Sequence, residues 1–473
     1  MTSTNNDSLR NFAVAERELR KEQLGQLVAY QSLAFPGYDP AQSHKCAEVI
    51  ADMLREIGFS HIEMLDVNSQ NPTVWAETKS TKAGESDHSN QKPTVFLYAH
   101  YDVQPAPMDQ GWDSDPWTMV ERDGRYFGRG TADDKAGIVQ HLSALRTVCE
   151  YFGVAGVDEL PFTIKICFEG EEEYGDSLPV YIPTDHERFK ADVFLVCDGG
   201  NLERGKPILQ TTLRGVAELN IEIQTLPNAL HSGAFGGPAP DAYLALTRLI
   251  SSMYDAEGNT VIEGVKSSDY VGSAVYSEEL FRRQAEVPED IELVGIVKEG
   301  DIASKLWTHP AATVVGVDMP SIEESSNIVI PKVSAKISLR FPSGQDGVTV
   351  LAALKQHLQA HIPWGAKLTF TDENVMNAFA VLSTDGSAGG PLTTLMKECL
   401  TEAFQFPCGE AGSGGSIPLL EVLQQYSPDA EFLLFGPIDS ELSNVHGANE
   451  SVCIDELEKC TIAEALFLSK LGS

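Results

Sequence analysis

Hydrophobic and polar positions first indicate an α/β fold. Apolar residues recur at helical spacing from Leu9 to about Ile57, which predicts successive helices that stop at Gly58. The helical pattern returns at 133–152. Strand, helix, strand alternation of this kind predicts helices packed on a mostly parallel sheet. The predicted buried strands are three compact apolar runs, TVFLYAH (94–100), FTIKICFEG (162–170) and DVFLVCDGG (192–200).

The pattern changes near residue 212. Residues 215–226 and 332–341 alternate in the manner of half-buried strands, and 241–254 and 348–362 have helical spacing. After residue 381 the helix–strand rhythm of the first part resumes. We therefore predict one α/β domain in two parts, with an inserted α+β domain whose sheet is mostly antiparallel. The predicted domain boundaries give 1–211 and 382–473 for the first domain and 212–381 for the insertion.

Composition narrows the classes of partner. A chain of 473 residues is long for one core, in agreement with two domains. Its net charge of −35 argues against nucleic acid and anionic membranes as partners. No apolar run approaches membrane-spanning length, and the polar segment 79–92 is typical of a surface loop. The eight cysteines form no CxxC pair, so a reducing, cytoplasmic location is expected.

Side chains of metal-ligand type follow the predicted strands. In open α/β sheets, binding sites lie at the carboxyl ends of the strands, so these residues are expected to meet. Each motif alone is more often structural, and only their occurrence together at strand ends favours chemistry. Two histidines with three carboxylates form a nitrogen and oxygen donor set that zinc accepts. The candidates are His100 and Asp102 in YAHYDVQP, Asp133 in GRGTADDK, Glu172 and Glu173 in EGEEEYG, Asp198 in VCDGG, and His446.

This donor set predicts a two-metal hydrolase. Two divalent ions lower the pKa of a shared water and polarise a substrate carbonyl. Asp133 suits the bridging position because it lies in a Gly-rich turn ahead of a helix. Asp102 is placed to fix the tautomer of His100. Because the adjacent Glu172 and Glu173 side chains diverge, one is expected to bind metal and the other to act as general base.

The stretch HYDVQPAPMDQGWDSDPWTMVERDGRYFGRGTADDKAG resembles the M20 metallopeptidase family, in particular its dipeptidases of the cytosolic non-specific and carnosinase type. The resemblance covers nearly the whole chain through EGEEEYG, VCDGG, LHSGAFGG, SLRFPSG, GGSIP and NVHGANE. It implies that Asp133 bridges two metals, that Glu172 is the base and that Asp102 orients His100. It also implies a cis peptide between Asp133 and Asp134. The implied ligands are His100, Asp133 and Asp198 for one metal, and Asp133, Glu173 and His446 for the other.

The resemblance also assigns roles within the insertion and in the GGSIP segment that follows it in the chain. His231 of LHSGAFGG would reach the active site of the other subunit of a homodimer and stabilise an oxyanion there. Arg340 and the GGSIP residues Gly415 and Ser416 would bind the substrate's terminal carboxylate. Further substrate contacts are implied for Thr313 and Asn327. Two departures from relatives, Ser413 before the GGSIP glycines and Ala136, leave the ligands untouched, although Ser413 bears on substrate preference.

We therefore expect a cytoplasmic, metal-dependent dipeptidase, with a catalytic domain and an inserted lid that forms a homodimer. Its substrate would be a small peptide with a free C-terminal carboxylate. Two divalent ions per subunit are expected, with zinc first and manganese or cobalt accepted by the same donors. One alternative is an N-acyl amino acid deacylase or desuccinylase, which uses the same metal chemistry. A second alternative is a catalytically silent binding or dimer-scaffold protein with the same fold.

Overall fold

The structure, a computed structural model, describes residues 3–78, 93–269, 272–295, 302–381 and 389–472. The predicted loop 79–92 lies outside the described residues. The chain divides into two compact units, the first comprising 1–211, 381–410 and 422–473 and the second 212–380 and 411–421. The sequence analysis had assigned 411–421 to the first domain. The segment joins the second unit because Gly412 packs directly on Trp307 and Ser413 accepts a backbone hydrogen bond from Arg214.

The first unit is built on a mixed sheet with a parallel centre. The strands of this sheet occur in the order β1-β2-β6-β3-β7-β18-β9-β16, and β17 also pairs with β9; the unit bounds assign β16 and the last residues of β9 and β17 to the second unit. The central strands β6, β3, β7 and β18 run parallel, and the flanking pairs are antiparallel. The predicted mostly parallel α/β sheet is thereby confirmed. The strand bounds are β1 His61–Leu65, β2 Thr73–Glu77, β3 Thr94–His100, β6 Thr163–Glu169, β7 Val193–Val196, β9 Ile208–Leu213, β16 Phe379–Ala380, β17 Gly409–Ser413 and β18 Glu431–Leu434, with smaller sheets from β4 Val120–Arg122, β5 Arg125–Phe127, β8 Gly200–Asn201, β19 Ile438–Asp439 and β20 Ser451–Cys453.

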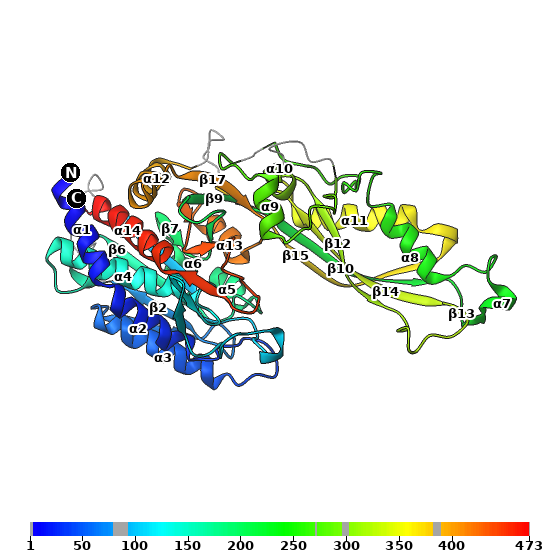
Figure 1. The fold of residues 1–473 in the computed structure, drawn as a ribbon, viewed down its shortest axis with the longest axis horizontal. Helices are drawn as coiled ribbons and strands as arrows, with labels where there is room; N and C mark the ends of the chain where they lie inside the picture. Colours follow the sequence, from blue (N-terminus) through cyan, green and yellow to red (C-terminus); the bar gives the residue numbers. More distant parts are fainter. Residues whose placement is uncertain (1–2, 79–92, 270–271, 296–301, 382–388, 473) are drawn as a thin grey trace. The chain divides into compact units, whose positions relative to one another are not determined.

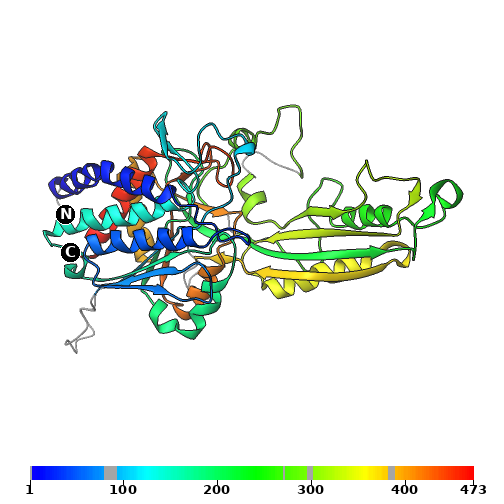
Figure 2. The same cartoon turned by 90° about the horizontal axis from the view of Figure 1, so that it is seen from below.

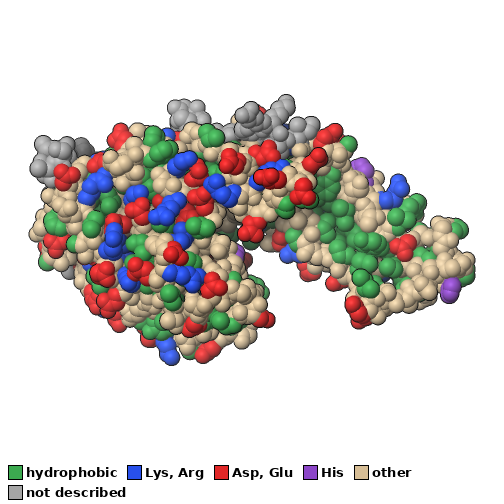
Figure 3. Space-filling view, in the orientation of Figure 1, with side chains coloured by type: hydrophobic (Ala, Val, Ile, Leu, Met, Phe, Trp, Pro, Cys, Tyr) green, Lys and Arg blue, Asp and Glu red, His purple; other side chains and the backbone are tan. Residues whose placement is uncertain are grey.

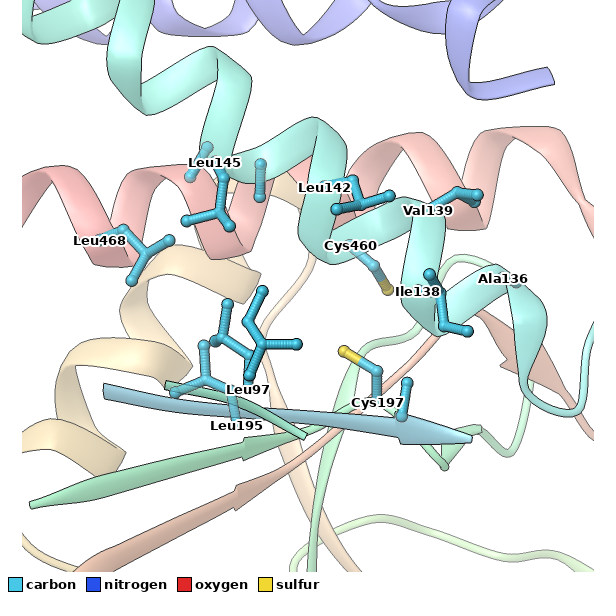
Figure 4. Packing of buried hydrophobic residues seen from close by; sticks show 14 of the residues in the cluster. Leu97, Ala136, Ile138, Val139, Leu142, Leu145, Leu195, Cys197, Cys460 and Leu468 are labelled. Carbon is cyan, nitrogen blue, oxygen red and sulfur yellow. The ribbon is translucent and has the colours of Figure 1, made fainter. Parts of the chain in front are cut away.

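Helices from both ends of the chain cover this sheet (Figures 1 and 2). Helices α4 and α14 contact each other, and side chains of both, Leu142 and Leu468 among them, reach the apolar layer that contains Leu97 of β3 and Leu195 of β7 (Figure 4). This apolar layer is nearly inaccessible to solvent and fixes the strands whose ends carry the ligand-type residues. The helix bounds are α1 Ser3–Ala15, α2 Arg17–Val28, α3 Ala41–Glu56, α4 Lys135–Phe152, α5 Ser177–Tyr181, α6 His186–Phe189, α12 Pro391–Phe404, α13 Pro418–Tyr426 and α14 Ile454–Leu471.

The second unit is an antiparallel sheet of four strands, in the order β12-β14-β10-β15. Every second residue of β10 is buried, as its alternating sequence predicted, because α8 and α11 cover one face of the sheet. The predicted α+β character of the insertion is confirmed. The bounds are β10 Gly215–Gln224, β11 Leu230–His231, α7 Ser232–Phe235, α8 Ala242–Ser251, α9 Glu278–Gln284, α10 Ile302–Trp307, β12 Ala311–Asp318, β13 Ile328–Val329, β14 Lys332–Phe341, α11 Gly347–His361 and β15 Lys367–Met376.

The expectations about membrane-spanning segments and about the cysteines can be compared with the structure. Among the described residues, no helix combines the length and apolar character needed to cross a membrane. All eight cysteines are free thiols, as their spacing predicted.

Candidate active site

The carboxyl ends of three parallel strands bring the ligand-type residues of the first unit together. His100 is the last residue of β3 and lies in register with the last residue of β6. Glu172 and Glu173 follow β6 after a short turn, and Asp198 follows β7. Since these strands are neighbours, their ends meet at one edge of the sheet, where α/β folds place their sites.

Asp133 lies at the centre of this group. Its Oδ1 atom is 2.9 Å from His100 Nε2, and its Oδ2 atom is 3.0 Å from His446 Nε2. His446 Nε2 also lies 3.2 Å from Glu173 Oε2. Burial would raise the pKa of Asp133, but hydrogen bonds from the two imidazoles outweigh it and lower that pKa. The peptide bond between Asp133 and Asp134 is cis, as the resemblance implied.

The ligand-type side chains form two groups. In each group, one donor atom from every residue lies within 4.8 Å of the others. The adjacent glutamates belong to different groups, as their divergence predicted. One group contains His100, Glu172 and Asp198, and the other contains Asp133, Glu173 and His446.

The charge of the site fits divalent cations. Among the described residues of the site, the carboxylates of Asp102, Asp133, Glu172, Glu173 and Asp198 outnumber the imidazoles of His100 and His446. Burial, together with the charge of Asp133, raises the pKa of Asp198 to about 7. Burial likewise raises the pKa of Glu172 well above its ordinary value. An excess of buried negative charge is costly unless cations neutralise it, and mixed imidazole and carboxylate donors are those that zinc accepts. The residues therefore fit the implied metals.

Asp102 holds more of the site than the sequence indicated. His100 Nδ1 lies 3.1 Å from the backbone carbonyl of Asp102 and 3.4 Å from its carboxylate. The same carboxylate accepts hydrogen bonds from the backbone amides of Glu172 and Glu173, at 3.0 and 2.9 Å. One buried side chain thus orients both His100 and the turn that carries the paired glutamates.

A buried ion pair that was not predicted from the sequence lies beside the second group. Glu450 accepts hydrogen bonds from the backbone amides of Gly130, Ala132 and Asp133, at 3.1, 2.9 and 3.1 Å. Arg129 pairs with the same carboxylate at 2.6 Å and donates to the carbonyl of His446 at 3.3 Å. This pair ties Asp133 to His446. Its only signal in the sequence is the position of its members within GRGTADDK and NVHGANE.

We expect the Glu450→Gln variant to bind zinc about 10- to 100-fold more weakly than the wild type, because Asp133 and His446 lose their common anchor. Isothermal titration of the metal-free protein measures this change, with the exposed Glu398→Gln substitution as control. Excess zinc is expected to restore activity. A purely structural role for Glu450 would instead lower the melting temperature and leave zinc affinity unaltered.

A third group of ligand-type residues is a hydrogen-bonded network to which we assign no metal. Glu464 of α14 accepts hydrogen bonds from His141 and Gln140, at 2.7 and 2.9 Å. Gln140 also contacts Cys197 Sγ, and His141 contacts the carbonyl of Tyr98. These bonds fasten α4 and α14 to strands β3 and β7, just before the ligand-type residues of those strands.

The residues that were expected to contact substrate from outside the metal site lie in two separate regions of the second unit. Arg340 donates from Nη1 to Ser416 Oγ at 3.0 Å, with Gly415 adjacent in the chain. Thr313 of β12 pairs with Ser338 of β14, two residues from Arg340. His231 and Asn327 lie beyond the opposite end of β14, where Asn327 accepts a hydrogen bond from the amide that follows His231.

These two places are far apart within the unit. At about 3.3 Å per residue, the eight steps from Lys332 to Arg340 span roughly 26 Å of β14. His231 pairs with Ile328 of β13, which precedes that strand. The structure therefore brings Arg340 and Ser416 together and keeps His231 and Asn327 away from them.

Comparison with known proteins identifies the family. The model of peptidase family M20/M25/M40 matches residues 96–470. The cysteinylglycine-S-conjugate dipeptidase of Corynebacterium striatum is 38% identical over 100% of this chain and 98% of its own length. The Cys-Gly metallodipeptidase dug1 of Schizosaccharomyces pombe is 32% identical over 89% of this chain and 86% of its own length.

Solved structures share the fold. The crystal structure of human carnosine dipeptidase 1 superposes with a TM-score of 0.78 at 20% identity and covers 99% of this chain and 98% of that one. The family match also includes all the ligand-type residues of the first unit. The chain therefore belongs to the M20/M25/M40 family of peptidases and is a hydrolase.

Proposed function

We propose that the protein is a metal-dependent dipeptidase that hydrolyses small peptides with a free C-terminal carboxylate. The observation that carries this proposal is the position of Asp133, whose two carboxylate oxygens face imidazoles of two different ligand groups. This is the arrangement that a carboxylate bridging two cations requires. Full-length similarity to a cysteinylglycine-S-conjugate dipeptidase supports the substrate class.

The metals would be held by the two groups of the first unit. His100 and Asp198 would bind one ion, Glu173 and His446 the other, and Asp133 both. When bound, two divalent ions, with zinc expected first and manganese or cobalt as alternatives, would supply Lewis acidity for activating water and polarising the peptide carbonyl. The mixed imidazole and carboxylate donors support this assignment.

Glu172 would be the general base. It takes the proton of the attacking water and delivers it to the leaving amine. Two observations support this role over that of Glu173. The Glu172 side chain belongs to the group with His100 and Asp198, whereas Glu173 contacts His446 and accepts a hydrogen bond from Gln104 at 2.6 Å. Asp102 holds the backbone of both glutamates, which fixes their divergence.

Arg340 and Ser416 would bind the terminal carboxylate of the substrate, together with the backbone of Gly415. A guanidinium and a carboxylate form strong, charge-assisted hydrogen bonds. Ser416 keeps Arg340 in place, since its hydroxyl oxygen accepts from that guanidinium and its hydrogen is donated to the carbonyl of Arg214. We assign Thr313, on the strand beside Arg340, to a further substrate contact, and Asn327 to one made together with His231 at the other end of β14.

We propose that two chains form a homodimer in which the second unit of each acts as a lid for the other. His231 lies roughly 26 Å or more along β14 from Arg340, so one chain cannot bring both residues to one small substrate. Strand β12 is an edge of its sheet. It exposes Val315 and Val317, and Figure 3 shows apolar side chains gathered on this unit. An apolar edge strand of this kind favours pairing with a second copy.

The His231→Ala variant is expected to lose most activity, because the partner's site would lack an oxyanion donor, a change worth about 10²–10³-fold in kcat. Mixing it with an inactive Glu172→Gln chain tests the exchange between subunits. Each mixed dimer contains one site with both residues, so random reassociation is expected to recover about a quarter of wild-type activity. Recovery of none would place His231 in the site of its own chain or outside catalysis.

The substrate class is tested with a panel of free dipeptides and their N-acetylated and C-amidated forms, using metal-reconstituted protein. Preferential cleavage of free dipeptides is expected. Preference for the N-acylated forms would instead support the deacylase or desuccinylase alternative. Failure of the purified protein to bind metal or to cleave any substrate would support the catalytically silent scaffold. The eight free thiols support a cytoplasmic location for the enzyme.

A further inference from the structure

Arg214 is a half-buried cation to which no anionic side chain of the described residues is bonded. It lies in the second unit, between the end of β9 and the start of β10. Within the described part of the chain, its Nε atom is buried and has no hydrogen-bond acceptor. Burial, together with the positive charge of Arg340, lowers the pKa of Arg214 to about 10. An unpaired buried charge is costly, so this position needs a functional explanation.

A second positive charge, that of Arg340, acts on Arg214. The second guanidinium, Arg340, is also largely buried, and burial lowers its pKa although the charge of Glu218 opposes this effect. Glu218 is itself paired with Lys336 at 3.1 Å. Ser416 connects the two arginines, since it accepts from the Arg340 side chain and donates to the Arg214 backbone. Ser416 thus lies between the guanidinium of Arg340 and the backbone of Arg214, and among the described residues no carboxylate is bonded to either guanidinium.

The glycine-rich segment keeps this site open. A methyl group at Gly414 would lie 3.0 Å from Arg214 Nη2, so a larger side chain there would press on the guanidinium. Ser413, whose carbonyl accepts from the Arg214 amide, contributes a hydroxyl rather than a carboxylate. That hydroxyl is already bonded to the amide of Gly415 at 3.2 Å. Gly414 therefore leaves space beside Arg214, and neither Gly414 nor Ser413 carries a carboxylate.

We propose that Arg214 is a second guanidinium of the carboxylate site, so that the terminal carboxylate of the substrate is bound by Arg214 and Arg340 together. This inference rests on the proposed function of Arg340. A carboxylate has two oxygens and can accept from two guanidinium groups at once, which makes the pair selective for a full negative charge over a neutral amide. Ser413 contributes to this selectivity because it leaves Arg214 without an internal acid.

Calorimetric titration with free leucine and with leucinamide tests the proposal without requiring hydrolysis. The Arg214→Gln variant is expected to bind leucine roughly 10- to 100-fold more weakly than the wild type, the range for one charge-assisted contact. Leucinamide binding is expected to be unaffected, and Arg214→Lys to recover part of the loss. The exposed Arg248→Gln substitution in α8 of the same unit is the control.

A second pair of variants, at Ser413, tests the same proposal. Ser413→Glu would supply the missing internal carboxylate and is expected to weaken leucine binding as Arg214→Gln does. Ser413→Gln, of the same size but neutral, is expected to retain it. Equal losses for leucine and leucinamide in Arg214→Gln, or equal effects of the two Ser413 variants, would overturn the proposal. Kinetics with leucyl-leucine separate this proposal from the proposed dipeptidase function. A wild-type protein that binds leucine through Arg214 but cleaves no dipeptide would contradict the dipeptidase function and leave the role of Arg214 intact.

Discussion

Replacement of Glu172 by glutamine is expected to lower kcat by about 10²–10⁴-fold, the usual contribution of a general base. Glutamine preserves the size of the side chain, and the backbone amide of residue 172 keeps its hydrogen bond to Asp102. The other donors of both ligand groups are untouched. The variant is therefore expected to fold and to bind metal like the wild type, while losing the group that accepts a proton.

The measurement combines kcat for a dipeptide with the metal content of the same sample. Glu171→Gln is the matched control, because it makes the same change one residue earlier in EGEEEYG, outside both ligand groups. An active Glu172→Gln enzyme would remove Glu172 from the role of base. An inactive variant that has also lost metal would make Glu172 a ligand, with the base to be sought elsewhere.

Asp133→Asn is expected to have the widest effect of any single ligand substitution, because Asp133 alone faces both imidazoles. An amide carries no charge to balance two cations. Loss of several kcal/mol of charge stabilisation corresponds to about 10³-fold or more in kcat/KM. The affinity for both ions is expected to fall, because each group would lose a charged carboxylate oxygen of Asp133.

Elemental analysis and melting temperature measure this effect. Zinc is expected to raise the melting temperature of the wild type, since a ligand that binds only the folded state stabilises it, and to change that of Asp133→Asn far less. The exposed Asp109→Asn substitution is the control. A variant that lost one ion and kept the other at full affinity would show that Asp133 is an ordinary ligand of one group.

Much of this architecture could be predicted from the sequence because burial leaves periodic patterns. The run at 94–100 became the fully buried β3, and the alternation at 332–341 became β14. Strand β12 was missed because it is an edge strand with mostly exposed residues, so its sequence carries no alternation. The short strand β1 was missed as well, since five residues give too few positions for a period.

The candidate ligands could be predicted because they follow apolar runs, as His100 and Asp198 do. Residues that act through backbone amides leave no such signal. The Glu450 carboxylate binds three amides of a loop more than 300 residues earlier in the chain, and only the folded structure joins them. Ser416 illustrates a second limit. The sequence indicates a hydroxyl available to substrate, whereas in the structure that hydroxyl bonds to Arg340 and to the Arg214 carbonyl.

The measurement that tests the central claim most directly is a zinc titration of the metal-free wild type, with dipeptide hydrolysis followed per chain. The two ligand groups around Asp133 predict that activity reaches its maximum at two equivalents of zinc per chain. They also predict that Glu172→Gln binds the same two equivalents without turnover. Full activity at one equivalent, or in the metal-free protein, would contradict the two-metal account.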